Sequence, residues 1–484
     1  MQDNPRIAII GAGFGGIGLA ILLRQAGITN FTIYERAASL GGVWRDNCYP
    51  GAACDIPSHL YSFSFEHHYP WSRRYAPQPE IFAYLNHCAK KYAIYERIVL
   101  NTEIDTVIFD DYRGLWKLFS NGNTIAEANI LVSAVGQFSH PVIPNIPGRN
   151  HFAGWQFHSS RWDPGFDPHD LKVALIGTGA SAIQIGPAIA PIVKHLSIFQ
   201  RSAPYVFPKG PDAFSTVQRA RFSRFPFLRS LDRMRIYSSY ERRIPRRSSD
   251  RLVSASEADF RQLLAAKLPD PERRRLATPD HPWGCKRVLL SNNWYETLCA
   301  PNVTVISEAV EKIEVSRLRT RDGAHHAVDA IIYCTGFAPA EFLKTMRVVG
   351  LKGKVLSESW KDGAEAYFGI TVAGFPNFFM MFGPNTNIPG SVVYMLESQA
   401  RYIVQAVRAF RRGRPRYVVV REEAQVKFNK TLQKALRKTV WSTGNCTSWF
   451  KAPSGKITTQ WPGFLFTYRH LTRRVRRRDY DLVP

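Results

Sequence analysis

The chain has 484 residues, which at roughly 150 residues per domain is long enough for about three structural units with a sizeable core. Hydrophobic residues make up 45% and charged residues 21%, and the 13% of aromatic residues excludes wholesale disorder. The 64 Lys and Arg residues against 39 Asp and Glu give a net charge of +25, which favours an anionic partner: nucleic acid, an anionic membrane or a phosphorylated small molecule.

The first 35 residues carry the pattern of a dinucleotide-binding unit. A buried-strand run over 6–10 leads into Gly11-Ala-Gly13-Phe-Gly-Gly16, followed by an expected helix and a second strand that ends at Glu35. Glycines at these positions permit a tight turn and the close approach of a pyrophosphate to the helix N-terminus. Because a carboxylate at the end of the second strand accepts hydrogen bonds from ribose hydroxyls, the pattern predicts a nucleotide that lacks a 2′-phosphate.

The same pattern occurs a second time. A strand over 171–176 leads into Gly177-Thr178-Gly179-Ala-Ser181-Ala, an apolar helix and a strand over 195–199. This strand ends at Gln-Arg201-Ser202 rather than at an acidic residue, and a cation with a hydroxyl suits a 2′-phosphate. The sequence therefore predicts one site for a plain adenosine dinucleotide and one for NADPH.

The rest of the chain completes these two units. Strand-to-glycine junctions at 130–136 and 330–336 end one unit each, prolines between 141 and 147 mark a linker, and the arginine- and aromatic-rich stretch 208–285 lacks strand runs. We therefore predict an α/β fold with two Rossmann-like dinucleotide-binding domains and a helical insertion in the second. The expected ranges are 1–147 for the first part of the first domain, 148–370 for the second domain with its insertion at about 208–285, and 371–484 for the return to the first domain and the C-terminal segment.

The seven cysteines include no CxxC pair, so neither a metal site nor a disulfide framework is indicated, and a reducing cytoplasm fits best. Cys48 and Cys54 leave open a disulfide reductase, which places a redox cysteine pair after its first nucleotide unit. Five residues separate them and Pro50-Gly51 lies between, which disfavours the helix that presents such a pair. The longest apolar run, 7–23, contains five glycines, so neither a signal peptide nor a membrane span is expected.

A third motif stands between the two dinucleotide patterns. It reads Phe152-Ala-Gly154-Trp-Gln-Phe-His158-Ser-Ser-Arg-Trp162-Asp163. This stretch resembles the FxGxxxHxxxW(P/D) fingerprint of the type I Baeyer–Villiger monooxygenases, which are class B flavoprotein monooxygenases, and it lies where that family carries the fingerprint. His158 is either a proton donor or, as we favour, a packed histidine in the linker between the domains.

The resemblance covers nearly the whole chain and implies further site residues. Asp55 matches the aspartate of the family's flavin segment, although Ala53 stands where relatives commonly have arginine. Lys286 and Arg287 resemble a Lys-Arg pair in which the lysine binds the NADPH 2′-phosphate and the arginine lies over the flavin. The implied cofactor-binding residues are Gly11, Gly13, Gly16, Glu35, Val43, Trp44, Asp55, Tyr61 and Ile104 for FAD, and Gly177, Thr178, Gly179, Ser181, Arg201, Ser202 and Lys286 for NADPH.

The resemblance implies an enzyme that uses FAD, NADPH and O2 to convert a ketone to an ester or lactone through a peroxyflavin and a tetrahedral adduct. Arg287 would hold the peroxide anion and the oxyanion, because arginine keeps its charge when partly buried, and Asp55 would orient it. The alternative is an N- or S-oxygenating flavin-containing monooxygenase, against which Trp162-Asp163 and Arg287 both argue.

The basic clusters at 242–251, 408–416 and 469–478 contain no recognisable nucleic-acid motif. They are interpreted as solvated surface, with peripheral contact between the C-terminal cluster and an anionic membrane left open. Aromatic residues of the insertion and the C-terminal segment mildly favour a bulky or aryl ketone: Phe225, Phe227, Tyr237, Trp283, Trp441, Trp449 and Phe450. The sequence does not determine the oligomeric state.

Overall fold

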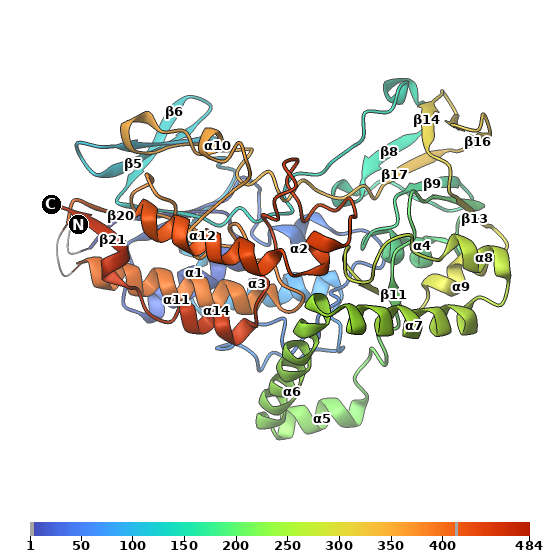
Figure 1. The fold of residues 1–484 in the computed structure, drawn as a ribbon, viewed down its shortest axis with the longest axis horizontal. Helices are drawn as coiled ribbons and strands as arrows, with labels where there is room; N and C mark the ends of the chain where they lie inside the picture. Colours follow the sequence, from blue (N-terminus) through green and yellow to red (C-terminus); the bar gives the residue numbers. More distant parts are fainter. Residues whose placement is uncertain (1–3, 412–414) are drawn as a thin grey trace.

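The computed structural model describes residues 4–411 and 415–484. Two halves lie side by side (Figure 1): the beginning and the end of the chain form one half, and the middle of the chain forms the other. Each half is built on a five-stranded parallel sheet, and the two sheets have the same order in four of their five strands. Among the described residues no helix is long and apolar enough to cross a membrane.

The first sheet has the order β19-β7-β1-β2-β3. Its strands are β1 (Ile7–Ile10), β2 (Phe31–Tyr34), β3 (Ile98–Val99), β7 (Ile130–Ser133) and β19 (Phe378–Met380). Helices α1 (Phe14–Gln25) and α11 (Val392–Arg411) pack against each other beside this sheet, and α2 (Val43–Asp46) and α3 (Gln78–Lys91) lie nearby. The central strand β1 is buried along its whole length because strands flank it on both sides.

The second sheet has the order β13-β10-β9-β17-β8. Its strands are β8 (Trp155–His158), β9 (Lys172–Ile176), β10 (His195–Phe199), β13 (Val303–Ile306) and β17 (Ala330–Tyr333), with helices α4 (Ala182–Ile189) and α9 (Trp294–Cys299) beside them. The strands and glycine turns expected in both units are present. The middle of the fingerprint motif, taken from the sequence as linker, is the edge strand β8 of this sheet.

The first half also carries a smaller sheet with the order β18-β4-β5-β6. Its strands are β4 (Thr106–Asp110), β5 (Leu115–Ser120), β6 (Asn123–Ala128) and β18 (Arg347–Val349), followed by α10 (Leu356–Ser359). Since β18 pairs in parallel with β4, the chain has already returned to the first half at residue 347. The expected boundary between residues 370 and 371 therefore lies too late.

The chain crosses between the halves twice, and the two crossings pair with each other. Pro141 and Phe337 form an antiparallel bridge. Val142 N donates to Gly336 O at 2.9 Å, and Ala338 N donates to His140 O at 3.2 Å. The two connections therefore form a short antiparallel ribbon at the junction of the halves.

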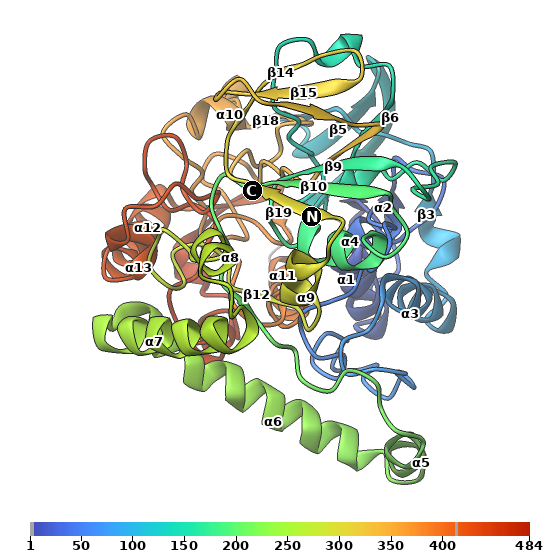
Figure 2. The same cartoon turned by 90° about the vertical axis from the view of Figure 1, so that its right-hand side faces the viewer.

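The insertion expected at 208–285 contains α5 (Thr216–Arg224), α6 (Phe227–Arg243), the 3-10 turn η4 (Ile244–Ser248), α7 (Asp250–Lys267) and α8 (Pro271–Leu276). Ser215 and Gln218 form a reciprocal capping box that starts α5. Figure 2 shows α5 and α6 projecting away from the rest of the molecule. Phe225 and Phe227 are 43% and 59% exposed on this projection, so they do not serve as pocket residues.

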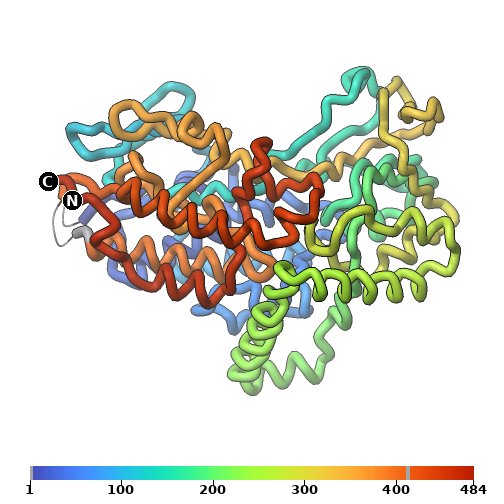
Figure 3. Tube along the Cα trace, viewed as in Figure 1, coloured from blue at the N-terminus to red at the C-terminus, as the bar shows by residue number. Residues whose placement is uncertain are grey.

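The remaining elements cover the two sheets. The second half carries β11 (Val206–Phe207) paired with β12 (Leu289–Leu290), and the antiparallel set β14 (Val310–Ile313), β15 (Arg317–Thr320) and β16 (His325–Ala327). The C-terminal part carries β20 (Tyr417–Val420), α12 (Glu422–Leu436), α13 (Val440–Thr443), α14 (Leu465–Leu471) and β21 (Tyr480–Val483). Figure 3 shows this part, in red, reaching from the first half to the middle of the molecule.

The turn from β1 to α1 requires glycine for steric reasons. Gly11 has a φ of +103°, and a Cβ on Gly16 would overlap the carbonyl oxygen of Gly11. Gly13 differs, since its nearest neighbour to an added Cβ is the Cα of Gly42 at 3.7 Å. Gly16 is therefore needed for the turn itself, whereas the space beside Gly13 is open.

We predict that Gly16→Ala prevents accumulation of folded protein, because the clash is with backbone that cannot move independently. Gly13→Ala should fold, with a thermal unfolding midpoint close to that of the unchanged protein, and should lose affinity for the group that binds against the turn. Expression yield, thermal unfolding and cofactor content of the purified variants check this pair. Equal loss of folded protein in both variants would contradict it.

Candidate active site

A cavity of about 800 Å³ lies between the two halves and is lined by both. Nine of the residues expected at the FAD or catalytic positions line it: Gly11, Gly13, Glu35, Val43, Trp44, Asp55, Tyr61, Ile104 and Arg287. Lys286 lines it as well, next to Arg287. Residues that are far apart in the sequence are therefore gathered around one space.

Glu35 follows the last residue of β2 and is 5% exposed. Its carboxylate is held by hydrogen bonds from the glycine turn after β1 and from two other positions. Its Oε2 accepts from Ala12 N at 2.8 Å, and its Oε1 accepts from Ala37 N at 3.1 Å and from Arg45 Nη1 at 3.0 Å. The carboxylate is fixed at the edge of the cavity by these donors. Such a fixed acceptor beside a glycine turn fits a ribose hydroxyl.

The segment after the first unit brings aromatic side chains to the cavity. Trp44 Nε1 donates to the hydroxyl oxygen of Tyr61 at 3.0 Å, and their rings meet edge to face. Burial raises the pKa of Tyr61, which keeps its hydroxyl neutral. The pair forms a rigid apolar wall with one polar atom, the arrangement expected beside a flat ring.

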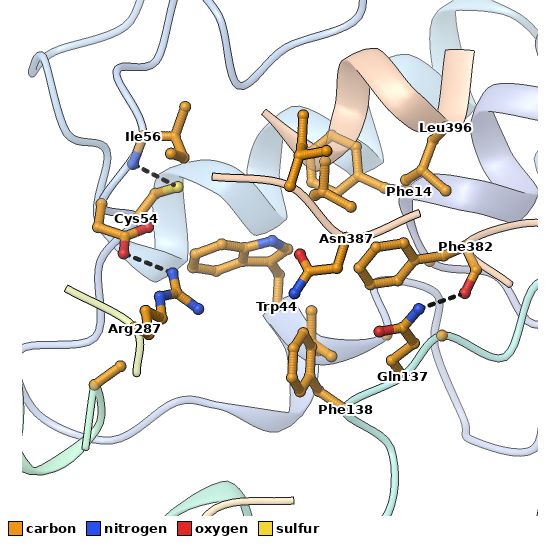
Figure 4. Close-up of a pocket in the computed structure, with 18 of the residues that line it drawn as sticks. Phe14, Trp44, Cys54, Ile56, Gln137, Phe138, Arg287, Phe382, Asn387 and Leu396 are labelled. Atoms are coloured by element: carbon orange, nitrogen blue, oxygen red, sulfur yellow. Dashed lines mark hydrogen bonds and ion pairs between the residues drawn. The ribbon is translucent and has the colours of Figure 1, made fainter. Parts of the chain in front are cut away.

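An ion pair between the two halves stands in this cavity. Arg287 Nη2 donates to Asp55 Oδ2 at 2.6 Å, and 44% of the Arg287 side chain is exposed. Asp55 raises the pKa of Arg287, an effect larger than the opposing effect of burial. Figure 4 shows Arg287 and Trp44 near each other, with Gln137 and Phe382 toward the opposite side of the view. The result is a permanent positive charge that is oriented from one side and open on the other.

The second glycine turn has the same steric demand as the first. Gly177 has a φ of +102°, and a Cβ there would lie 2.6 Å from Cys334 O. Lys286 Nζ donates to Ser202 Oγ at 2.8 Å, and Thr178 Oγ1 donates to Ser202 O at 3.1 Å. Burial lowers the pKa of Lys286, and the positive charge of Arg201 lowers it further while Asp280 raises it.

Arg201, Ser202 and Lys286 are therefore brought together, and two neighbouring cations beside a hydroxyl fit a phosphate dianion. Gly16, Gly177, Thr178, Gly179, Ser181, Arg201 and Ser202 do not line the central cavity.

The fingerprint residues have structural contacts and do not line the cavity. Phe152 is buried, a Cβ on Gly154 would overlap Asp329 O, and Trp162 packs edge to face on Phe166 at 5.7 Å. Asp163 accepts a hydrogen bond from Gly165 N at 2.8 Å, which stabilises the turn that follows the fingerprint.

His158 is 1% exposed and joins the fingerprint to the crossing ribbon. Its Nε2 donates to Gly336 O at 3.0 Å, so Nδ1 accepts from Ser160 N at 3.1 Å. Burial lowers the pKa of His158 to about 4. The ring is buried, neutral and hydrogen-bonded through both nitrogens, and it does not line the cavity. A packed role in place of proton donation stays our prediction for His158.

The contacts of the cavity fit a bound dinucleotide and a flat ring system. Gly13 leaves room for a pyrophosphate, and Gln137 Oε1 is buried at the cavity without a hydrogen-bond partner among the described residues. Gln137 Nε2 donates to Phe382 O at 2.8 Å, which fixes the amide so that this oxygen accepts from a bound group. The residues present therefore fit the FAD that the first unit predicts.

The cysteines do not form the redox pair of a disulfide reductase. Cys48 is exposed and Cys54 is buried, both are free, and burial raises the pKa of the Cys54 thiol. A disulfide does join Cys285 to Cys446, with Cα atoms 6.4 Å apart. It was not expected from the sequence, because 161 residues separate the partners. It ties the residue before Lys286 to the C-terminal segment.

Sequence reasoning missed the residues that dock the halves beside Asp55. Tyr49 donates from its hydroxyl to Gln184 Oε1 at 3.0 Å, and Gln184 Nε2 donates to Ala53 O at 2.9 Å. A Cβ on Gly51 would lie 2.6 Å from Gln184 O. The Pro50-Gly51 pair beside Tyr49 was the available signal, because glycine has no Cβ and lets another backbone segment approach closely.

Comparisons with known proteins agree with this geometry. Residues 8–205 match the family described as pyridine nucleotide-disulphide oxidoreductase. The chain is 42% identical over 481 residues to a Baeyer-Villiger monooxygenase of Pseudomonas aeruginosa, covering 99% of this chain and 91% of that one. It is 40% identical to a Baeyer-Villiger monooxygenase of Streptomyces coelicolor, covering 100% and 93%. The solved structure of an oxidised steroid monooxygenase bound to NADP has a TM-score of 0.88, 27% identity and 99% coverage of both chains.

His158 generates a prediction about acid stability. Its pKa of about 4 in the folded state lies below the value of about 6.5 for an unfolded histidine, so the unfolded chain binds the proton first as pH falls. The folded state should therefore lose about 2 kcal/mol at pH 5 relative to pH 7 from this group. His158→Gln keeps a donor for Gly336 O but does not titrate.

Thermal unfolding of both proteins at pH 7 and pH 5 measures the effect. The midpoint of the unchanged protein should fall more between these pH values than that of the variant. Equal falls would show that the ring is not held neutral.

Proposed function

The chain belongs to the family of Baeyer–Villiger monooxygenases, and on this basis we propose which of its residues carry each part of the reaction. A ketone, O2, NADPH and a proton give an ester or lactone, NADP⁺ and water. NADPH supplies two electrons as a hydride; one oxygen atom enters between the carbonyl carbon and its neighbouring carbon, and the other leaves as water. Bound FAD supplies the chemistry of accepting the hydride and activating oxygen.

The first half holds FAD in this proposal. The turn at Gly11, Gly13 and Gly16 receives the pyrophosphate at the start of α1, and Glu35 accepts from the ribose. Val43, Trp44, Tyr61 and Ile104 bound the space for the isoalloxazine ring. Two contacts on this side of the cavity support the assignment. The Glu35 carboxylate is fixed by hydrogen bonds at the cavity edge, and Trp44 and Tyr61 form an apolar wall.

The second half holds NADPH. Gly177, Thr178, Gly179 and Ser181 form the turn for its pyrophosphate, and Arg201, Ser202 and Lys286 bind the 2′-phosphate. The hydrogen bond from Lys286 Nζ to Ser202 Oγ, with Arg201 close enough to act on the pKa of Lys286, supports this assignment.

Arg287 is the catalytic residue in this proposal, and the Asp55 ion pair is the observation that carries it. The carbonyl oxygen gains negative charge when its carbon is attacked, and a guanidinium already in place stabilises that charge without reorganisation. Asp55 holds the guanidinium on one side and leaves its remaining N–H groups for the substrate. Lysine would not serve as well, because an ammonium loses its proton more easily when buried.

The proposed substrate remains a bulky or aryl ketone. Trp283, Trp441, Trp449 and Phe450 line the cavity, whereas Tyr237 packs against Tyr394 outside the lining.

We further propose domain bounds and a location. Residues up to about 140 and from 347 onward form the FAD domain, residues 148–340 form the NADPH domain, and the protein lies in the cytoplasm. The five free cysteines among the described residues support that location, and the Cys285–Cys446 disulfide is unusual for it.

Supplying ¹⁸O2 to the purified flavoprotein with NADPH and a ketone should place one labelled oxygen atom in each ester formed. Arg287→Ala should lower the rate of ester formation about 100-fold, the loss in kcat typical of removing one oxyanion donor. Mass spectrometry of the product and NADPH absorbance measure both quantities. Products that are only sulfoxides or N-oxides, from a panel that also offers sulfides and amines, would instead support the N- or S-oxygenating alternative.

Lys286→Ala should raise the KM for NADPH about 10- to 100-fold, the cost of one charge-assisted hydrogen bond to the 2′-phosphate. The KM for NADH should change much less, because NADH lacks that phosphate. Lys194→Ala removes the same charge from an exposed position of the second half and serves as control. Steady-state oxidation of NADPH and NADH gives the ratio of their KM values. An equal rise in the KM for NADH would show that Lys286 does not bind the 2′-phosphate.

A further inference from the structure

Three arginines at the end of α6 line the cavity. Arg243 is the last residue of α6, and Arg246 and Arg247 lie in η4, the turn that continues it. Tyr240, three residues before Arg243, lines the cavity too, so spacings of three and seven residues bring these side chains to one face. The interpretation of the cluster 242–251 as solvated surface is therefore wrong for Arg247, whose Nη1 is buried, whereas Arg243 and Arg246 line the cavity from exposed positions.

Arg247 is a desolvated cation without an acceptor. Its Nη1 is buried and has no hydrogen-bond partner, and its guanidinium carbon lies 5.9 Å from the centre of the Trp441 ring. Burial lowers the pKa of Arg247 to about 9, with a smaller contribution from the positive charge of Arg243. A buried charge without a partner costs free energy, and a bound anion removes that cost.

The surrounding protein does not supply this anion. Over residues 4–411 and 415–484, no carboxylate forms an ion pair with any of the three arginines, although Asp259 lines the same cavity. Trp283 Nε1 is a second buried donor in the lining without an acceptor. Two unsatisfied donors and a cluster of cations indicate that the missing partner is a ligand rich in anionic oxygen.

These arginines lie apart from the proposed 2′-phosphate site. Arg243, Arg246 and Arg247 line the cavity, whereas Arg201 and Ser202 of the proposed 2′-phosphate site do not. Tyr240 lies close enough to Asp55 and to Arg243 for both charges to act on its hydroxyl. Burial raises the pKa of Tyr240, the negative charge of Asp55 raises it further, and the positive charge of Arg243 lowers it. The arginines and the Asp55–Arg287 pair therefore line the same cavity, in which we propose that the substrate reacts.

We propose that the substrate is a ketone that also carries a carboxylate, bound by Arg247 and Arg243 while its carbonyl oxygen reaches Arg287. This inference rests on the proposed function, since Arg287 fixes where the carbonyl lies. A guanidinium binds a carboxylate with two parallel hydrogen bonds, which is why arginine suits this role better than lysine. The stacking of Arg247 on Trp441 holds the guanidinium in place for that contact.

The test compares straight-chain methyl-ketone acids of increasing length, each against its own methyl ester, with the FAD-loaded enzyme and NADPH. The unchanged enzyme should have a higher kcat/KM for the acid than for the ester at the matching length. Arg247→Gln should lower this acid-to-ester ratio about 10- to 100-fold. Arg242→Gln removes the same charge one residue before Arg243, at an exposed position outside the lining, and should leave the ratio unchanged.

A second readout is binding of the acids to the oxidised enzyme, followed by the change in flavin absorbance without turnover. If Arg247→Gln does not accumulate as folded protein, Arg243→Gln repeats both measurements. Three results would overturn the proposal: no acid binds better than its ester, Arg247→Gln weakens acid and ester equally, or it raises the saturation constant for NADPH by as much as it lowers the ratio. The last result would mean that the arginines bind NADPH and not the substrate.

The two proposals fail in different ways. If acids bind in an Arg247-dependent manner but no ketone is converted to an ester, the carboxylate site stands and the proposed oxygenation fails. If neutral ketones are converted and acids neither bind nor react, the oxygenation stands and the carboxylate site fails.

Discussion

The ion pair between Arg287 and Asp55 is the interaction on which the site depends. Its partners are 232 residues apart and belong to different halves, so the pair forms only when both halves are folded and docked. The carboxylate sets the direction of the guanidinium and stabilises its charge. Without the pair, the guanidinium of Arg287 would have no carboxylate to set its direction in the cavity.

The two halves dock through contacts that lie close to this ion pair in space. Tyr49 and Gln184 hydrogen-bond across the interface, and Gly51 permits the backbone of the first half to approach α4 closely. The tight turn at Pro50-Gly51 thus serves the same purpose as the glycine turns at the nucleotide sites: it allows two backbone segments to lie closer than side chains would permit.

Features governed by local sequence could be predicted, and those governed by distant contacts could not. Strand β10 has the bounds expected from the sequence, and the turns after β1 and β9 carry glycine where the backbone has a positive φ. The pairing of β18 with β4 and the disulfide between Cys285 and Cys446 join segments about 240 and 161 residues apart, and nothing local marks either partner. Arg247 was misassigned to solvated surface because composition gives the net charge of a cluster and does not show which of its side chains is buried.

The antiparallel ribbon formed by residues 140–142 and 336–338 has a mechanical consequence. Two separate tethers would let the halves slide and twist, but tethers that are hydrogen-bonded to each other bend together as one strip. His158 clamps one edge of this strip through Gly336. At this place the halves therefore share one hydrogen-bonded connection instead of two independent ones, so neither crossing segment can shift without the other.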